Sequence, residues 1–551
     1  MTSKGQPMFL VNNLPRYAAL LAVTILTACT TISPEQATLK ASAARIKADM
    51  AFLADDALKG REAGTEGYDV AAVYVADQYQ ALGLKPAAAD DSFFQQVNLR
   101  AYKRNPEKMA MRLSGDDANL DLTYIDDFLT SNSAKYEDKT ITGDLVFVGY
   151  GLDAPDYGYT DYHDLDVAGK IIVMLGTMPE NIPSEIRAHY KITRMKTAGA
   201  AGAIGVLTVY APGFEKRLPW KHAAQLATRE GVTWVDENGI AKDRAPGIEA
   251  SAIMSPKASA MLFDGAAKSY QEIIDQMKAD KNFKPEGFAL NRKVSLSLGS
   301  TFRDTTSRNV VAMLEGSDPT LKHEYVILSA HLDHIGLAHK DDMSGDIINN
   351  GAMDNASGTA TMLEAARSFL AEEQRPLRSI IFAAVTAEEK GLIGSDYLAQ
   401  HPLPGGTMVA NVNLDMPLIL YPFEDVIAFG AEHSTLEPIV RRATERMGVS
   451  LTPDPVPQMN LFVRSDHYSF VKQGVPSVFL FLGFANGGEK IFKKFMSTNY
   501  HDVGDDLSQK IDYYQGARFA KINYLIAKEI ADANQKPEWN EGDVFGDLFG
   551  R

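Results

Sequence analysis

Histidine and carboxylate side chains recur at five points in the second half of the sequence, each just after an apolar run or in a loop returning to it. The five residues are His331, Asp354, Glu389, Asp415 and His501. The run before His331, Tyr325–Ala330, is β-branched and apolar and predicts a buried strand. Open α/β sheets bind ligands at the carboxyl ends of their strands. Two imidazoles and three carboxylates without cysteine indicate a divalent metal site, zinc above all, with cobalt or manganese as substitutes.

Three neighbours of these ligands are candidates for supporting roles. If Glu389 binds metal, Glu388 lies beside the metal-bound water, where it can take a proton and later deliver it to a leaving amine. Asp333, two residues past His331 on an extended chain, shares its face and can hold the other imidazole nitrogen. His334 competes for that role, but it faces the other way, which favours a structural histidine.

The order of these motifs resembles the di-zinc aminopeptidase family, whose relatives include glutamate carboxypeptidase, the transferrin-receptor ectodomain and glutaminyl cyclase. The matching motifs are His331-x-Asp333, Asp354-Asn355-Ala356-Ser357-Gly358, Glu388-Glu389-x-Gly391, Asp415 after a strand, and Tyr500-His501. The resemblance spans about Asp49–Phe94 and all of Val294–Leu525.

The resemblance implies two zinc ions per chain, with Asp354 bridging both. It places His331 and Asp415 on one zinc, and Glu389 and His501 on the other. It also implies a water between the metals that Glu388 activates.

Two further residues are candidates for contact with substrate. The resemblance implies that the Tyr500 phenol donates to the developing oxyanion, although a packed aromatic ring is an alternative. Arg464 lies where the family lines its substrate cleft, but an ion pair with Asp466 would explain it equally well. Segment Gly483–Asn499 is longer than in the family and carries three lysines, so the shape and charge of the specificity pocket stay open.

The region around these residues predicts an α/β fold with a mixed central β-sheet flanked by helices, of the zinc exopeptidase type. An amphipathic helix is expected at Thr359–Leu370, after the loop that carries Asp354. The expected strands are Val310–Leu314, Tyr325–Ala330, Ser379–Val385, Met408–Leu414 and Val478–Leu482.

A block at residues 131–290 has a different texture and lacks any cluster of metal-binding residues. Its runs Val148–Gly151, Asp164–Lys170 and Ala198–Ala203 resemble the protease-associated domain, which implies an inserted, mainly-β domain. We expect this block to shape access to the site without contributing a metal ligand. It divides the catalytic domain into residues 43–130 and 291–535, and residues 536–551 form a C-terminal tail.

The amino end predicts export and anchoring. Lys4 and Arg16 precede an apolar run, Tyr17–Leu26, and Leu26-Thr27-Ala28-Cys29 resembles a bacterial lipobox. This implies a signal peptide at residues 1–28, lipidation of Cys29, a tether at residues 29–42 and a lipid-anchored protein at the bacterial cell envelope. The alternative is an ordinary secretory signal with a chance cysteine. Cys29 is the chain's single cysteine, which excludes structural disulfides.

Length and charge limit the classes of partner. The chain has 551 residues, enough for two domains or one elaborated domain, and a formal net charge of −16. Acidity of this size argues against nucleic acid or an anionic membrane surface as a partner.

These observations predict a zinc-dependent aminopeptidase that removes amino-terminal residues from peptides. Three alternatives stay open: a glutaminyl cyclase-type acyltransferase with one zinc, a carboxypeptidase, and a non-catalytic binding module. The complete set of five ligands argues against the first, and the retained Glu388 argues against the last. The sequence decides neither side-chain preference nor oligomeric state.

Overall fold

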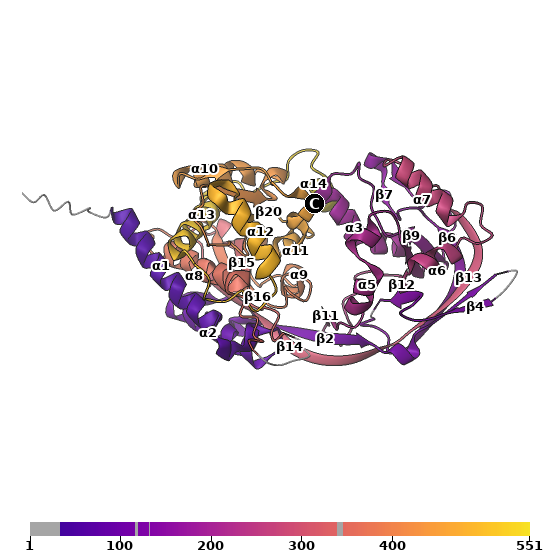
Figure 1. The fold of residues 1–551 in the computed structure, drawn as a ribbon. Coiled ribbons are helices and arrows are strands. Elements are labelled where there is room, and N and C mark those ends of the chain that lie inside the picture. The colour runs from indigo at the N-terminus through magenta and orange to yellow at the C-terminus, as the bar shows by residue number, and fades with distance from the viewer. Residues whose placement is uncertain (1–32, 116–118, 132, 339–344, 551) are drawn as a thin grey trace, which may run out of the picture.

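The computed structural model describes residues 33–115, 119–131, 133–338 and 345–550. The chain forms two bodies, each built around its own β-sheet, which lie side by side in Figure 1. Among the described residues, no helix has the length and apolar character needed to cross a membrane. Cys29, the signal peptide and the first residues of the predicted tether lie outside the described residues.

The first sheet has ten strands and carries the predicted ligands. Its order is β11-β2-β14-β16-β15-β17-β20-β18-β19, with β1 pairing on β14. Strands β15, β16, β17 and β20 run parallel, β2, β11 and β14 pair antiparallel to their neighbours, and β18 pairs antiparallel with β20 but parallel with β19, so the sheet is mixed. The bounds are β1 Lys85–Pro86, β2 Phe94–Arg104, β11 Gly231–Trp234, β14 Ser300–Leu314, β15 Glu324–His331, β16 Ser379–Val385, β17 Thr407–Leu414, β18 Asp425–Phe429, β19 Ser450–Leu451 and β20 Ser477–Leu482.

Helices bury both faces of this sheet, which explains why its central strands are apolar at every position rather than at alternate ones. Along β15, Val326 and Leu328 belong to the core under the helices α1, α8 and α13, whereas Ile327 packs on the opposite side with residues of α9 and α11. The bounds are α1 Pro34–Leu53, α2 Glu66–Ala81, α8 Ser357–Leu370, α9 Ile393–Gln400, α10 Leu436–Arg446, α11 His467–Val471, α12 Gly488–Thr498, α13 Tyr513–Asp532 and α14 Val544–Phe549.

The predicted fold class is confirmed: the structure is a mixed α/β fold with helices flanking its sheets. All five predicted strands are present, and each lies within or one residue from a strand of the first sheet. The predicted helix at Thr359–Leu370 corresponds to α8.

The second sheet has eight strands in the order β4-β3-β13-β6-β9-β10-β12-β5. It extends beyond the predicted block at both ends, because β13 pairs with both β3 and β6 and so adds residues from before 131 and after 290. Five helices accompany these strands, so the body is α/β rather than mainly β. The bounds are β3 Ala110–Ser114, β4 Asn119–Leu122, β5 Phe128–Thr130, β6 Lys139–Phe147, β9 Ile171–Leu175, β10 Gly205–Val209, β12 Ala250–Met254, β13 Phe288–Leu298, α3 Ser184–Ala200, α4 Phe214–Arg217, α5 Trp220–Leu226, α6 Pro256–Met261 and α7 Tyr270–Ala279, with a small ribbon of β7 Asp153–Ala154 and β8 Tyr159–Thr160.

Besides β11, which pairs with β2 of the first sheet, a paired-strand junction and a helix junction join the bodies. The paired strands β2 and β14 run from one body toward the other (Figure 1). At the second junction, His189 of α3 lies 2.5 Å from the hydroxyl of Tyr468 of α11. The C-terminal tail closes this junction: Phe545 of α14 is buried, and His433 lies 2.7 Å from Asp543 and 3.3 Å from Glu185.

The predicted tether at residues 29–42 is wrong from Pro34 onward, because α1 begins there. Ser33 and Gln36 form a capping box that starts the helix. Leu39 and Ile46 are buried in the main core, and Arg45 pairs with Glu364 of α8 at 2.5 Å. The polar composition hid this helix because only one narrow stripe of it faces the protein.

We expect Leu39→Ala to lower the free energy of unfolding by about 2 kcal/mol, because it removes buried methyl groups and leaves a cavity. Chemical denaturation of the purified protein measures this change. Lys40→Ala, at the exposed neighbouring position, should leave stability unchanged. An unchanged stability for Leu39→Ala would mean that the start of α1 does not pack on the body of the first sheet.

Candidate metal centre

The carboxyl ends of β15, β16 and β17 meet at one edge of the first sheet and bring the predicted ligands together. His331 is the last residue of β15 and pairs in register with Val385, the last residue of β16. Glu388 and Glu389 follow β16 within a short loop, and Asp415 directly follows β17. Since β15 lies between β16 and β17, its histidine is flanked by carboxylates from both sides.

The first group consists of His331, Asp354 and Asp415. The Nε2 atom of His331 lies 3.1 Å from Asp354 Oδ1 and 3.2 Å from Asp415 Oδ1. All three side chains are largely buried, and their ligand atoms lie close enough to hold one metal ion. Burial alone would lower the pKa of His331, but the charges of Asp415 and Glu388 raise this pKa well above its usual value.

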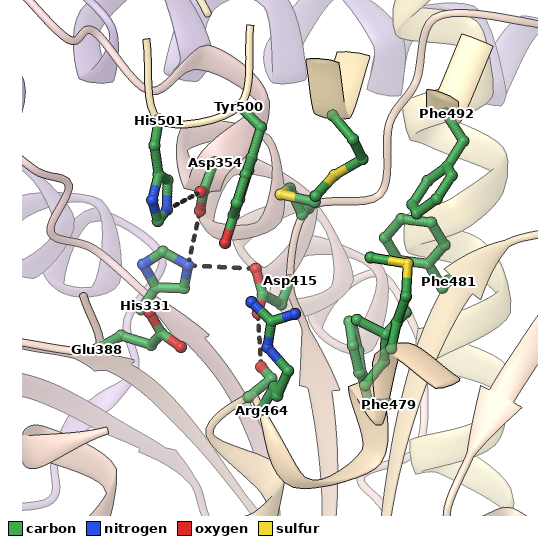
Figure 2. A pocket seen from close by; sticks show the side chains of 15 residues that line it. His331, Asp354, Glu388, Asp415, Arg464, Phe479, Phe481, Phe492, Tyr500 and His501 are labelled. Atoms are coloured by element: carbon green, nitrogen blue, oxygen red, sulfur yellow. Dashed lines mark hydrogen bonds and ion pairs between the residues drawn. The ribbon is translucent and has the colours of Figure 1, made fainter. Parts of the chain in front are cut away.

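The second group forms on the other oxygen of Asp354. The Nε2 atom of His501 lies 3.3 Å from Asp354 Oδ2 and 3.0 Å from Glu389 Oε2. Asp354 therefore offers one carboxylate oxygen to each histidine, as Figure 2 shows from the side of the pocket. This is the arrangement in which a carboxylate bridges two ions.

His334 also belongs to this second group. Its Nδ1 lies 2.7 Å from Glu389 Oε1, while its Nε2 is buried without a hydrogen-bond partner. His334, Asp354 and Glu389 lie close enough to hold a metal ion. The sequence favoured a structural role for His334 because adjacent strand residues point to opposite faces, but the chain has already left β15 there and turns the ring back toward Glu389.

Asp333 is buried as expected, but its carboxylate contacts other atoms than those predicted. It accepts the backbone N–H groups of Glu388 at 3.0 Å and Glu389 at 3.3 Å. Its Oδ1 lies 4.0 Å from His331 Nδ1, too far for a hydrogen bond, and that nitrogen instead lies 3.1 Å from the main-chain oxygen of Asp333. Asp333 thus fixes the loop that carries Glu388 and Glu389.

Sequence reasoning missed Arg61, which is fully buried beneath the site. Its guanidinium donates to the carbonyl oxygens of Leu332 at 3.0 Å, Asn350 at 2.6 Å and Gly351 at 3.1 Å, and to that of Leu53. Burial lowers its pKa to about 10, which leaves it charged at neutral pH. Only the turn-rich surroundings of Arg61 were visible in the sequence, since its partners are main-chain atoms far away in the chain.

Two other side chains hold the ligand loops in place. Asp505 accepts the backbone N–H groups of Met353 at 2.9 Å and Asp354 at 3.0 Å. Ser465 donates to Asp415 Oδ2 at 2.5 Å and accepts from Asn413 at 2.7 Å. The main chain of Asp354 and the carboxylate of Asp415 are therefore held by neighbours that are not among the predicted ligands.

Glu388 lines the pocket beside the two groups without occupying a ligand position. Burial raises its pKa well above the usual value for glutamate, against the charge of His331, and the carboxylate of Glu389 raises the pKa further. Tyr500 stacks on His501 with ring centroids 3.9 Å apart and lines the same pocket. Both residues therefore line the pocket beside the predicted ligands.

Arg464 is exposed at the pocket, and within the described residues no ion pair joins it to Asp466. Asp466 is instead fully buried, with both carboxylate oxygens lacking a hydrogen-bond partner. The side chain of Arg464 extends toward the site in Figure 2. The guanidinium of Arg464 is thus available to a ligand. An ion pair with Asp466, the alternative that the sequence offered, would have occupied it.

A pocket opens beside the predicted ligands, and Figure 2 shows the rings of Phe479, Phe481 and Phe492 on the side away from His331 and His501. Its apolar lining residues are Met416, Met459, Leu461, Phe479, Phe481, Phe492 and Met496. The long segment 483–499 supplies two of these from α12, whose lysines Lys490, Lys493 and Lys494 are exposed. The segment adds apolar wall to the pocket and directs its positive charge to solvent.

Comparison with known proteins identifies the region that carries this site. Residues 309–527 match the model of peptidase family M28, and all five predicted ligands and Glu388 lie within that range. A probable zinc metalloprotease of Leptosphaeria maculans is 40% identical over 266 residues, which cover 42% of this chain and 58% of the relative. The aminopeptidase NAALADL1 of Mus musculus is 34% identical over 149 residues, covering 26% and 18%.

The chain spans half or less of the length of several curated relatives that it matches, for example 50% of a probable zinc metalloprotease of Pyricularia oryzae, at 28% identity and with 41% of this chain covered. Among solved structures, an aminopeptidase from Aneurinibacillus sp. strain AM-1 aligns with a TM-score of 0.46 and 18% identity, covering 91% of this chain and 96% of that one.

Proposed function

We propose that this chain is a zinc-dependent exopeptidase, and specifically an aminopeptidase that binds two zinc ions. The observation that carries the proposal is the Asp354 carboxylate, which gives one oxygen to each of two histidine groups at the mouth of an apolar pocket. The match of residues 309–527 to a zinc-peptidase family region supports the same conclusion.

The donor set fits zinc. His331 and Asp415 would hold one ion, Glu389 and His501 would hold the other, and Asp354 would bind both. His334 is a further candidate ligand for the second ion, because its Nδ1 atom lies beside Glu389. Without a cation, the carboxylates of this buried cluster repel one another at considerable cost. Zinc, when bound, supplies Lewis acidity that polarises a carbonyl and makes water more acidic.

Glu388 is the proposed general base. Its carboxylate lies beside the ligands, and its backbone N–H donates to the carboxylate of Asp333, which fixes the main chain at this residue. In this position it takes a proton from the attacking water and returns the proton to the leaving amine as the peptide bond breaks. Tyr500 donates its phenolic proton in a hydrogen bond to the oxygen of the tetrahedral intermediate.

The shape of the pocket supports a preference for large apolar side chains next to the scissile bond. Its far end presents aromatic and methionine side chains, and burying a leucine or phenylalanine there contributes about 1.5–3 kcal/mol. Aminopeptidase action is the first candidate. A carboxypeptidase is the second, because the exposed Arg464 guanidinium could hold a terminal carboxylate by two parallel hydrogen bonds.

We also propose that lipidation of Cys29 anchors the chain at the bacterial cell envelope. Since α1 begins at Pro34 and packs on the catalytic body, few residues separate the anchor from the enzyme. We expect Cys29→Ser to release the protein from the membrane fraction and to abolish labelling by a fatty-acid precursor. Retention of both would contradict this proposal.

We expect Glu388→Gln to keep two zinc ions per chain while kcat falls by about 10²–10⁴, because the amide keeps the size of the side chain but cannot accept the proton. Steady-state kinetics with an amino-terminal leucine amide and elemental analysis measure the two effects. Glu389→Gln is the matched control: it weakens a ligand, so added zinc should recover part of its activity.

Near wild-type turnover in fully metallated Glu388→Gln would remove Glu388 from the mechanism. Saturation at one zinc per chain would contradict the two-ion site and favour the acyltransferase alternative. Zinc binding without turnover of any peptide would favour a binding module.

Peptides blocked at one end distinguish the two candidate activities. We expect a peptide with a free amino terminus and an amidated carboxyl terminus to be cleaved, and an N-acetylated peptide with a free carboxyl terminus to resist. Leucine or phenylalanine at the amino end should give a higher kcat/KM than aspartate. The reverse end preference, with a raised KM in Arg464→Ala, would establish a carboxypeptidase.

A further inference from the structure

One segment of the inserted block is built into the catalytic sheet. Between β10 and β12 of the second sheet, the chain crosses over and forms β11, which pairs antiparallel with β2 at the edge of the first sheet. From Gly231 to about residue 245 it contacts α9 and the loop before it. That loop, residues 386–392, carries Glu388 and Glu389.

Trp234 is the main anchor of this segment on α9. Its indole N–H donates to Asp396 Oδ2 at 3.0 Å, and its ring packs edge-on against Tyr397 and His401. The side chain is 7% exposed, so the hydrogen bond to a charged acceptor is largely shielded from water. Lys242 adds a bond to the amide oxygen of Gln400 at the end of α9.

Asp396 connects this anchor to a second part of the site. Besides Trp234, it accepts from Lys472 at 3.1 Å, one residue beyond α11. Helix α11 follows Arg464 and Ser465, and Ser465 holds the ligand Asp415. Asp396 thus links the inserted segment, through Trp234, to the end of α11, through Lys472.

Arg244 holds the loop itself. Its Nη2 donates to the carbonyl oxygen of Gly391 at 3.1 Å, and Gly391 donates its own N–H to the carbonyl oxygen of Glu388 at 2.8 Å. The guanidinium of Arg244 is therefore linked through one residue, Gly391, to the backbone of Glu388, the proposed general base. A separate contact at the same loop is made by Lys390, which pairs with Glu62 at 2.6 Å.

The loop needs such external contacts because its backbone is not in a relaxed conformation. Ala387 and Leu392 have φ values of 54° and 58°, in the left-handed region that side chains with a Cβ disfavour. Residues in such conformations persist where the surroundings determine them. Asp333 fixes the loop from within, and the inserted segment fixes it from outside.

We propose that the segment 231–245 of the inserted block is a positioning element for the general-base loop, with Trp234 and Arg244 as its positioning residues. The inserted block then acts on the chemical step and not only on access to the site. This inference rests on the proposed peptidase function and on Glu388 as its base. None of the residues 231–245 lines the pocket beside the ligands, so their loss should change turnover rather than substrate binding.

The test compares two variants that each remove one hydrogen bond. Arg244→Ala removes the bond to Gly391, and Trp234→Phe keeps an aromatic ring but removes the bond to Asp396. We expect kcat to fall about three- to tenfold in each, the range that a lost hydrogen bond of ordinary strength produces, with KM changed less than twofold and zinc content unchanged. Arg244→Lys, which keeps a donor of similar reach, should recover most of the kcat.

Arg292→Ala is the matched control, because Arg292 also donates to a backbone carbonyl, that of Asp264 at 3.2 Å, but within the second body. It should leave kcat and KM unchanged. Unchanged kcat in both Arg244→Ala and Trp234→Phe, or a change confined to KM, would overturn the proposal and leave the segment a mere attachment.

Hydrogen–deuterium exchange of residues 386–400 separates this inference from the proposed function. We expect faster exchange there in Arg244→Ala and Trp234→Phe than in the wild type and Arg292→Ala, whether or not the protein cleaves peptides. A wild-type protein without peptidase activity would refute the proposed function alone. Unaltered exchange would refute the positioning of the loop.

Discussion

The structure depends on keeping several carboxylates close together in a buried place. Asp333, Asp354, Glu388, Glu389 and Asp415 all lie at one sheet edge, where burial and mutual repulsion oppose their negative charge. His331 and His501 lie between these carboxylates and offset the repulsion. Divalent cations, which this set of side chains fits, would offset it further. Much of the surrounding chain supplies further compensation by donating hydrogen bonds.

This compensation comes from three kinds of donor. Backbone N–H groups face Asp333 and Asp505, the Ser465 hydroxyl faces Asp415, and the buried Arg61 guanidinium binds the carbonyls of the loops that carry the ligands. Each donor fixes the orientation of a carboxylate or its loop before any ion arrives. A preorganised site of this kind loses little free energy to rearrangement when it binds metal or stabilises a transition state.

The second body contributes to this constraint from a distance. It is attached to the body of the first sheet by the long strands β2 and β14 and again through α3 and the C-terminal tail, and its β11 segment contacts the loop that carries Glu388. The pocket wall comes from another late segment, α12, which turns an apolar face inward and its lysines outward. The loop that carries Glu388 and the wall of the pocket are thus contacted by different stretches around one sheet edge.

The sequence by itself predicted the central strands, the helix α8, and the five candidate ligands with Glu388, which the structure brings together at one sheet edge. It could do so because a strand buried on both faces leaves an uninterrupted apolar run, and because ligands at strand ends stand next to such runs. It also predicted the inserted block, though not its limits, since only strand pairing assigns β3 and β13 to the second sheet.

Only the tertiary structure decided the contacts between residues far apart in the chain. The start of α1 appeared as a tether because its buried stripe is narrow, and Asp333 appeared to hold His331 although its carboxylate faces the loop after β16. Arg61, Asp505 and Arg244 left no signal because their partners are backbone atoms, which every residue possesses alike. Spacing in a sequence therefore reveals which side chains can do chemistry, whereas the folding of distant segments onto one another decides what holds them in position.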